Sequence, residues 1–193
     1  MALWRLLTPT AQANSAYNNQ YSDVAANDWY GLAIATMSNL GIVRGSEGIF
    51  RPNDPITRAE MAAILTRFYA PDTNNNTVPF SDVPSDFWAY ANIGTAYAMG
   101  WITGYPDGTF KPGGNTTRAE FATMVNRLNH RLIDLPDIPG GVCRFNDITA
   151  SHWGYAALVE ATNSHDFTRK TSTADNELWS QITGNGLDAA YNR

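Results

Sequence analysis

The sequence has few of the residues that form disulfides and metal sites. It contains one cysteine, Cys143, and three histidines, His130, His152 and His165, among 193 residues. A single cysteine excludes an internal disulfide and a zinc site built on cysteines. The histidines are far apart in the sequence, so we expect each to have a structural or surface role. We therefore expect neither a metal site nor a cofactor.

The chain also lacks an excess of positive charge and a long hydrophobic run. Its 13 Lys and Arg residues are outnumbered by 18 Asp and Glu residues, which argues against a nucleic-acid partner because phosphate binding relies on basic residues. An anionic ligand would need a local cationic site. No run approaches the roughly 20 apolar residues that span a bilayer, so we expect no membrane insertion. The apolar stretch in residues 1–7 is too short for a signal peptide, which leaves a cytoplasmic chain or a piece of a longer secreted protein.

Aromatic residues, in contrast, are abundant: the chain has 6 Trp, 9 Tyr and 8 Phe. Hydrophobic residues make up 44% and charged residues 16%, which is typical of a folded globular protein. Many aromatic side chains are therefore expected in the core. A surplus of Trp and Tyr is also typical of binding surfaces, because each combines an apolar ring with a polar group.

A repeated unit organises the sequence. An aromatic-polar-Asp-aliphatic segment occurs three times, at residues 21–24, 80–83 and 145–148. In each copy a tryptophan follows the aspartate by six positions, at Trp29, Trp88 and Trp153. Such self-similarity at a fixed offset is the sequence signature of a repeat architecture.

The first two copies share more than the third. Both have a glycine-rich turn, which ends at residues 48–52 and 108–112, and both have the motif Thr-Arg-Ala-Glu, which the third copy lacks. These features divide the chain into a lead-in segment over 1–20, repeat 1 over 21–71, repeat 2 over 80–131 and a degenerate repeat 3 over 145–193.

Each full copy has the pattern of two helices joined by a turn with a short extended piece. The first helix ends at Gly41 or Gly100, and both helices are apolar on one face, so each unit must pack against its neighbours. We expect Trp29, Trp88 and Trp153 to begin amphipathic helices and to pack in the core, with sugar stacking as the alternative. Repeat 3 is expected to contain a helix over 155–162 and to rebuild part of its second helix over 177–179. The fold class is mainly α, built from helix-turn-helix repeats with short extended segments.

The Thr-Arg-Ala-Glu motif fits a helix capping box. Thr57 and Thr117 would each accept a hydrogen bond from the backbone three residues on, and Glu60 and Glu120 would return one to the backbone of the threonine. We therefore expect these four residues to be structural.

The arginine of the motif has no part in capping. Arg58 and Arg118 each stand at the first helical position, where the helix dipole disfavours a cation by about 0.3–1 kcal/mol. Free backbone N–H groups and a guanidinium group would together form a site for a carboxylate or phosphate. The alternative is an ordinary ion pair with Asp23 or Asp82 of the same repeat.

Other candidate ligand contacts lie near the turns. Gly45 and Gly104 would let a ligand approach the backbone closely, although turn geometry alone also explains them. Trp101 and Tyr105 stand beside the turn of repeat 2, and we expect them to be exposed aromatic residues.

These motifs together resemble the S-layer homology domain, most clearly in residues 80–83, 87–89, 104–112 and 117–120. The resemblance covers residues 21–182, with two good copies and one degenerate copy. It implies a pseudo-threefold bundle of three units with ligand grooves between them, on the surface of mainly Gram-positive bacteria. The implied ligand is a secondary cell-wall polysaccharide, often carrying a pyruvylated amino sugar whose carboxylate would meet Arg58 and Arg118. The turn glycines of the family would fall on Gly45 and Gly104.

The expected function is therefore non-covalent anchoring of a larger surface protein to the cell wall, outside the cell and without catalysis. Because repeat 3 lacks Thr-Arg-Ala-Glu, at most two working grooves are expected. One alternative is a protein–protein assembly module of a surface layer. Another is a carbohydrate-active enzyme with Glu60 and Glu120 as acid and base, which their expected capping role disfavours.

Overall fold

The structure is a computed structural model that describes residues 7, 18, 20–69, 77–142, 145–171 and 175–185. Cys143 and most of the predicted lead-in segment lie outside these residues. The described part contains the helices and strands α3 (Gly31–Asn39), α4 (Arg58–Tyr69), α5 (Tyr90–Ala98), α6 (Arg118–Leu128), η1 (Leu135–Asp137, a 3-10 turn), α7 (Tyr155–Thr162), β1 (Asn163–Arg169) and β2 (Glu177–Asn185). The prediction of a mainly α chain is correct. None of the helices in this part is both long and apolar enough to cross a membrane.

Both full repeats have the predicted helix pair, with α3 and α4 in repeat 1 and α5 and α6 in repeat 2. The first helix of each pair ends before a glycine in the left-handed conformation, Gly41 at φ 71° and Gly100 at φ 73°. Glycine adopts this conformation without a steric penalty, which is why it terminates helices so often.

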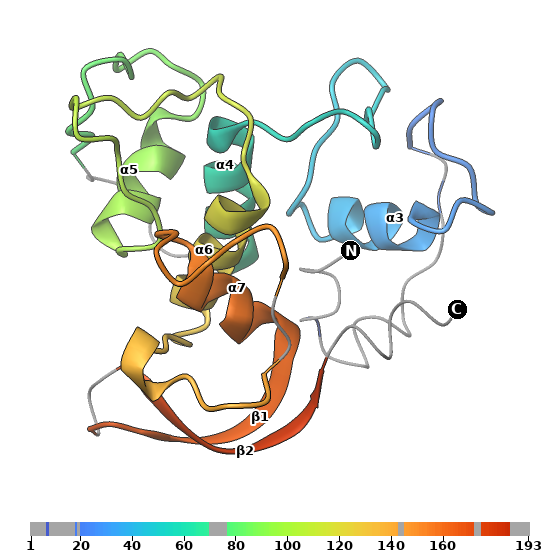
Figure 1. The fold of residues 1–193 in the computed structure, drawn as a ribbon. Helices are drawn as coiled ribbons and strands as arrows, with labels where there is room; N and C mark the ends of the chain where they lie inside the picture. The colour runs from blue at the N-terminus through green and yellow to red at the C-terminus, as the bar shows by residue number, and fades with distance from the viewer. Residues whose placement is uncertain are drawn as a thin grey trace.

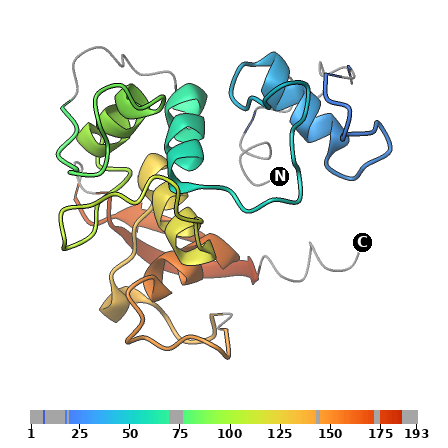
Figure 2. The same ribbon diagram turned by 90° about the horizontal axis from the view of Figure 1, so that it is seen from above.

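Packing between the helices runs from one repeat to the next. The second helix of repeat 1, α4, packs on α5 of repeat 2, and α6 of repeat 2 packs in the same way on α7 of repeat 3. Figure 1 and Figure 2 show α3 standing apart from α4, to which a long connection joins it. Each repeat therefore completes its neighbour.

The main core lies where these helices meet. The predicted inward faces of the second helices are buried, with Met61 at 1%, Leu65 at 0%, and Met124 and Leu128 at 4% exposure. A smaller cluster in repeat 3 contains Val142, Tyr155 and Val159. Most of the apolar burial thus connects repeats 1 and 2.

Repeat 3 differs from the prediction after its helix. The helix over 155–162 is present as α7, but residues 177–179 begin strand β2, so the expectation of a rebuilt helix there is wrong. β2 pairs antiparallel with β1, from Asn163 opposite Asn185 to Arg169 opposite Glu177. Glu177 and Trp179 turn inward while Leu178 and Ser180 are exposed, which is the alternation of a strand rather than the spacing of a helix.

A hairpin thus stands where a second helix would complete the third unit. The segment after α6 joins this hairpin through Leu132, whose N–H donates to the Asp175 carbonyl and whose carbonyl accepts from the Glu177 N–H. The pseudo-threefold bundle stays a prediction, because repeat 3 contributes one helix and a hairpin among the described residues.

Candidate ligand-binding site

Both Thr-Arg-Ala-Glu motifs form capping boxes at the starts of α4 and α6. The Glu60 N–H donates to Thr57 Oγ1 at 3.2 Å, and the Thr57 N–H donates to Glu60 Oε2 at 2.9 Å. The equivalent distances for Thr117 and Glu120 are 3.2 and 2.8 Å. These four residues therefore set where the two helices begin.

The arginine between them has a different role in repeat 1 from the one expected. Arg58 is 4% exposed and reaches into repeat 2. Its Nη1 donates to Glu120 Oε1 at 2.6 Å, its Nε to the Phe110 carbonyl at 2.8 Å and its Nη2 to the Thr103 carbonyl at 3.0 Å. Neither the expected open anion site nor an ion pair with Asp23 or Asp82 is found here.

The backbone at the start of α4 is occupied as well. The N–H groups of Arg58 and Ala59 donate to the carbonyls of Gly114 and Pro112, at 2.9 and 3.0 Å. The guanidinium also lies over the ring of Phe110, 4.6 Å from its centroid. The start of α4 is thus closed by repeat 2, and no acidic ligand group can reach it.

The second arginine of the motif lies in the opposite environment. Arg118 is exposed and forms no ion pair with any described residue. The N–H groups of Arg118 and Ala119 likewise have no acceptor among the described residues. The reason is the missing motif of repeat 3, which supplies no glutamate equivalent to Glu120. Arg118 is therefore exposed at the start of α6, and the anion site expected there stays a prediction.

Asp23 and Asp82, which begin the repeats, hold the turns. Asp82 accepts from the N–H groups of Phe110 and Lys111, both at 2.7 Å. Asp23 makes the same pair of contacts with Phe50 and Arg51, at 2.8 and 2.7 Å. These hydrogen bonds, and above all the one from the Phe50 N–H, keep the pKa of Asp23 below its ordinary value. Each aspartate thus fixes a residue with positive φ, 59° at Arg51 and 56° at Lys111.

The two turn glycines are required by packing. A Cβ at Gly45 would overlap the Ile49 carbonyl and lie 2.6 Å from the ring of Tyr21. At Gly104 it would overlap the ring of Phe80, the counterpart of Tyr21 in repeat 2. These contacts explain both glycines without a ligand, although Gly45 also lines the hollow described below.

The expected exposed aromatics of repeat 2 are not at the surface. Trp101 is 1% exposed and contacts Tyr69 edge-on, so its assignment as a surface residue is wrong. Tyr105 is half-buried and donates from its hydroxyl to Glu120 Oε1 at 3.1 Å. Burial raises the pKa of Tyr105 against the opposing effect of Arg58. Both residues belong to the contact between repeats 1 and 2.

The three tryptophans of the repeats were expected to be buried and are exposed. Trp29 is 76%, Trp88 56% and Trp153 65% exposed, so the expectation that they pack in the core is wrong. Each lies in the turn just before its helix, and α3, α5 and α7 begin two residues later. The helical face therefore does not extend to them. All three present an aromatic ring to solvent at the same position of the repeat.

A hollow of about 780 Å³ lies between repeats 1 and 2. It is lined by the turn of repeat 1, by one face of α4 and by Trp88 of repeat 2. Three arginines border it, Arg44, Arg51 and Arg67, of which Arg51 lies 3.8 Å from Glu60. Arg44 and Arg67 form no ion pair with any described residue. Burial, and then the charge of Arg44, lower the pKa of Arg67. The lining also contains the carboxylates of Asp54 and Glu60, so three arginines against two acids leave a formal excess of one positive charge.

Sequence reasoning missed these arginines. Arg67 does have a counterpart, Arg127, at the same distance from the threonine of the motif in repeat 2. The repeated arginine could have identified Arg67 as a candidate from the sequence. Arg44 gave no such signal, because its counterpart in repeat 2 is Thr103.

Two helix pairs joined by the contact of Arg58 with Glu120, with a hollow between the two units, define a helical repeat module. Two segments of the chain belong to the S-layer homology family, because the profile of the S-layer homology domain matches residues 20–62 and 79–122. These two segments are repeats 1 and 2.

Similar proteins are much longer than this chain. An amylopullulanase of Thermoanaerobacterium thermosulfurigenes is 38% identical over 118 residues, which are 58% of this chain and 6% of that protein. Cell surface glycoprotein 1 of Acetivibrio thermocellus is 29% identical over 170 residues, 80% of this chain and 7% of that protein. The cellulosome-anchoring protein of the same organism is 30% identical over 167 residues, 81% of this chain and 36% of that protein. The chain thus spans only a small part of the relatives that it matches.

Proposed function

We propose that this chain is a non-catalytic module that anchors a larger protein to the bacterial cell surface by binding an anionic cell-wall polysaccharide. The observation that carries the proposal is the hollow bordered by Arg44, Arg67 and Trp88. The relatives of this chain include proteins named for the cell surface and for anchoring. The chain matches only part of each of them, which fits a module attached to other domains.

The arginines of the hollow favour an acidic ligand. Arg44 and Arg67 repel each other, as the lowered pKa of Arg67 reflects after the effect of burial. A carboxylate placed between them relieves this repulsion and accepts charge-assisted hydrogen bonds. A pyruvate group on a sugar provides such a carboxylate, so the proposed ligand is a pyruvylated polysaccharide.

The tryptophans favour a sugar as the rest of the ligand. Trp88 lines the hollow with more than half of its surface exposed. An exposed indole offers an apolar face to the C–H groups of a sugar ring and an N–H to its hydroxyl groups. The hollow therefore combines arginines that can bind the acid with a tryptophan that can bind the ring.

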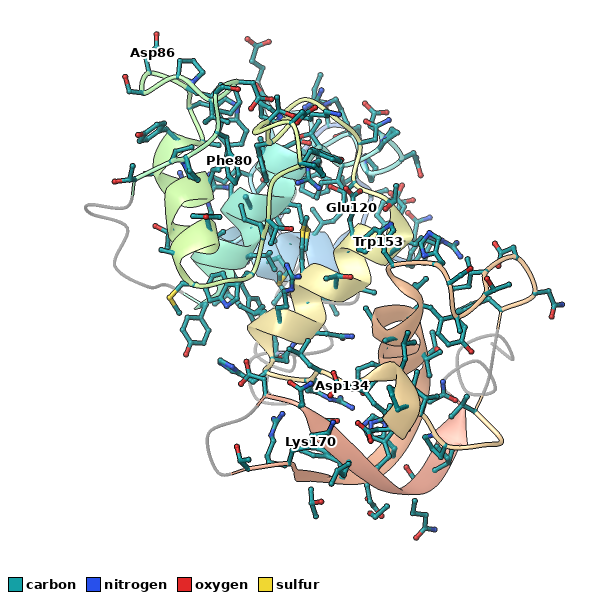
Figure 3. All side chains as sticks on the ribbon, turned by 60° about the vertical axis from the view of Figure 1, so that its left-hand side comes forward. Phe80, Asp86, Glu120, Asp134, Trp153 and Lys170 are labelled. Carbon is teal, nitrogen blue, oxygen red and sulfur yellow. The ribbon has the colours of Figure 1, made fainter. Side chains whose placement is uncertain are left out.

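A second contact is proposed at the start of α6, where Arg118 is exposed and the N–H groups of Arg118 and Ala119 have no acceptor among the described residues. Trp153 lies close to this helix start. Its neighbour Gly154 packs against Ala119, the second residue of α6, since a Cβ placed on Gly154 would lie 2.8 Å from the Ala119 Cβ. Figure 3 shows Trp153 beside Glu120 at this end of α6. Arg58, in contrast, is proposed to act only within the protein.

The enzyme alternative finds no support in the glutamates. Glu60 and Glu120 are held by their capping boxes, and Glu120 also accepts from Arg58 and Tyr105. The exposed tryptophans do suit protein–protein assembly, and self-association in light scattering without any affinity for wall polymer would favour that alternative.

The test is sedimentation with Gram-positive cell walls, before and after chemical removal of pyruvate. We expect wild type to sediment, Arg44→Ala/Arg67→Ala to lose most binding, and Arg118→Ala to lose part of it. Lys111→Ala is the control, since it removes an exposed cation outside the hollow. Full sedimentation of the double variant, or unchanged wild-type binding after pyruvate removal, would contradict the proposal.

A further inference from the structure

Repeat 3 contains a buried cluster of two carboxylates and an imidazole. Glu160 lies in the last turn of α7, His165 on β1 and Glu177 at the start of β2. Their side chains are 1%, 0% and 0% exposed. One atom of each lies within 4.8 Å of the other two, and the described residues contain no other such group of three.

The histidine ring is held in a defined orientation. His165 Nδ1 lies 2.8 Å from the Asn163 carbonyl, which can only accept, so Nδ1 carries a proton. Trp179 stacks on the ring at 3.7 Å between centroids. Nε2 consequently faces the carboxylates, 3.0 Å from Glu177 Oε2 and 3.5 Å from Glu160 Oε2. A histidine that ligates a metal is oriented in this way, by a hydrogen bond from its other nitrogen to a carbonyl.

Nε2 also contacts a cation of the protein itself. Arg131 Nη2 lies 3.1 Å from His165 Nε2 and 2.8 Å from Glu160 Oε1, so its guanidinium group stands against the cluster. The Arg131 side chain is 40% exposed, so a metal ion bound at Nε2 would displace this nitrogen toward solvent.

One carboxylate oxygen of the cluster has no donor. Glu177 Oε1 is buried and has no hydrogen-bond partner among the described residues, and its nearest cationic nitrogens are Arg169 Nη1 at 3.5 Å and Arg131 Nε at 3.7 Å. The Glu160 oxygens do have contacts, Oε2 with Trp179 Nε1 at 3.1 Å and Oε1 with Arg131 Nη2 at 2.8 Å. A buried carboxylate oxygen without a donor is costly unless a cation binds it.

We propose that Glu160, His165 and Glu177 form a binding site for a divalent transition metal, with Zn²⁺ as the ion that fits best. One imidazole nitrogen and two carboxylate oxygens are a donor set that zinc accepts. Zinc bonds of about 2.0–2.2 Å place neighbouring tetrahedral ligands roughly 3.3–3.6 Å apart. The distances from Nε2 to the two oxygens, 3.0 and 3.5 Å, are close to that spacing. A water molecule would complete the coordination.

The site explains how repeat 3 closes without a second helix. A metal bound there links α7 to both strands of the hairpin, across the smaller core that contains Trp179 and Ile182. We expected no metal site from the sequence, because the three histidines are far apart in it. The hairpin brings His165 next to two glutamates that lie 5 and 12 residues away.

The test is zinc binding by the full chain in metal-free buffer, measured by calorimetry and by metal content after dialysis. We expect one zinc per chain, a melting temperature that rises with zinc and falls again with chelator, and affinity at least tenfold weaker in His165→Ala and Glu177→Gln. His130→Ala is the matched control, because His130 is exposed and pairs with Asp175 near the same hairpin. We expect it to bind as wild type does.

Wild type that retains no zinc, or His165→Ala that retains as much as wild type, overturns the proposal. If the variants fail to fold, the absorption spectrum of Co²⁺ added to wild type tests the proposal instead. Intense absorption bands of low-symmetry, protein-bound cobalt support the site, and the unchanged spectrum of aqueous cobalt overturns it.

Discussion

Arg58 and Arg118 occupy the same position of the same four-residue motif, and their environments are opposite. Arg58 is enclosed by repeat 2, where it meets Glu120 and two backbone carbonyls. Arg118 stands at the start of α6 and is exposed. The local sequence is the same, so the difference comes from the next repeat.

Repeat 2 presents three acceptors to the arginine before it, and repeat 3 does not. The carboxylate of Glu120 and the carbonyls of Thr103 and Phe110 belong to the glycine-rich turn and the second capping box of repeat 2. Repeat 3 has a β-hairpin in place of both. The motif arginine therefore binds to the next repeat when that repeat is complete. Where the next repeat is incomplete, the arginine is exposed and could meet a ligand.

The largest expected effect is on the Arg58 contact. Arg58→Ala leaves a largely buried Glu120 carboxylate without its cation and should lower the free energy of unfolding by about 3–5 kcal/mol. Arg118→Ala removes an exposed side chain and should change it by less than about 0.5 kcal/mol. Urea denaturation followed by circular dichroism measures both. Equal losses in the two variants would show that the arginines are equivalent after all.

A smaller effect is expected at the aspartates that hold the turns. Asp82→Ala leaves the N–H groups of Phe110 and Lys111 without their acceptor and should cost about 1–3 kcal/mol in the free energy of unfolding. The counterpart Asp147 is exposed in a repeat without this turn, so Asp147→Ala should cost less than about 0.5 kcal/mol. The same denaturation experiment applies. A costly Asp147→Ala would reveal an undetected turn in repeat 3.

The contact between repeats 1 and 2 should also depend on pH. Burial alone would raise the pKa of Glu120, but hydrogen bonds from Thr117 and the charge of Arg58 lower it below its ordinary 4.5. The ionised form is thus favoured in the folded state. Its contribution to stability is complete above pH 4.5 and disappears as the pH falls through the lower folded-state value.

Glu120→Gln removes this titration, so its free energy of unfolding should fall less steeply below pH 4.5 than that of wild type. Chemical denaturation at a series of pH values provides the comparison. Parallel curves for the two proteins would mean that other carboxylates account for the acid sensitivity.

The smallest effect on stability is expected at the exposed tryptophans. Trp88→Ala should change the free energy of unfolding by less than about 0.5 kcal/mol, because its ring is largely in solvent. Its sedimentation with cell walls should nevertheless fall clearly, and that of Trp29→Ala much less, since Trp29 does not line the hollow. A large loss of stability in Trp88→Ala would show that the Trp88 ring has a structural role.

Prediction from the sequence succeeded where neighbours in the chain decide the structure. The helix over 155–162, the glycine stops at Gly41 and Gly100 and the two capping boxes depend on residues only a few positions apart. It failed for Trp88 and Trp101, one expected inside and found outside, the other the reverse. Helical spacing was extended two residues too far at Trp88, and the burial of Trp101 depends on the ring of Tyr69, which lies 32 positions earlier.

By itself, the sequence determined that the chain contains two full repeats, because the repeated motifs act through local hydrogen bonds and backbone conformations; the degenerate third repeat stays a prediction. Only the tertiary structure decided that Arg58 is enclosed while Arg118 is exposed, and that His165 meets Glu160 and Glu177. Those outcomes depend on contacts between distant segments. The side chain that a group meets there, and the water it loses, fix its charge and its role.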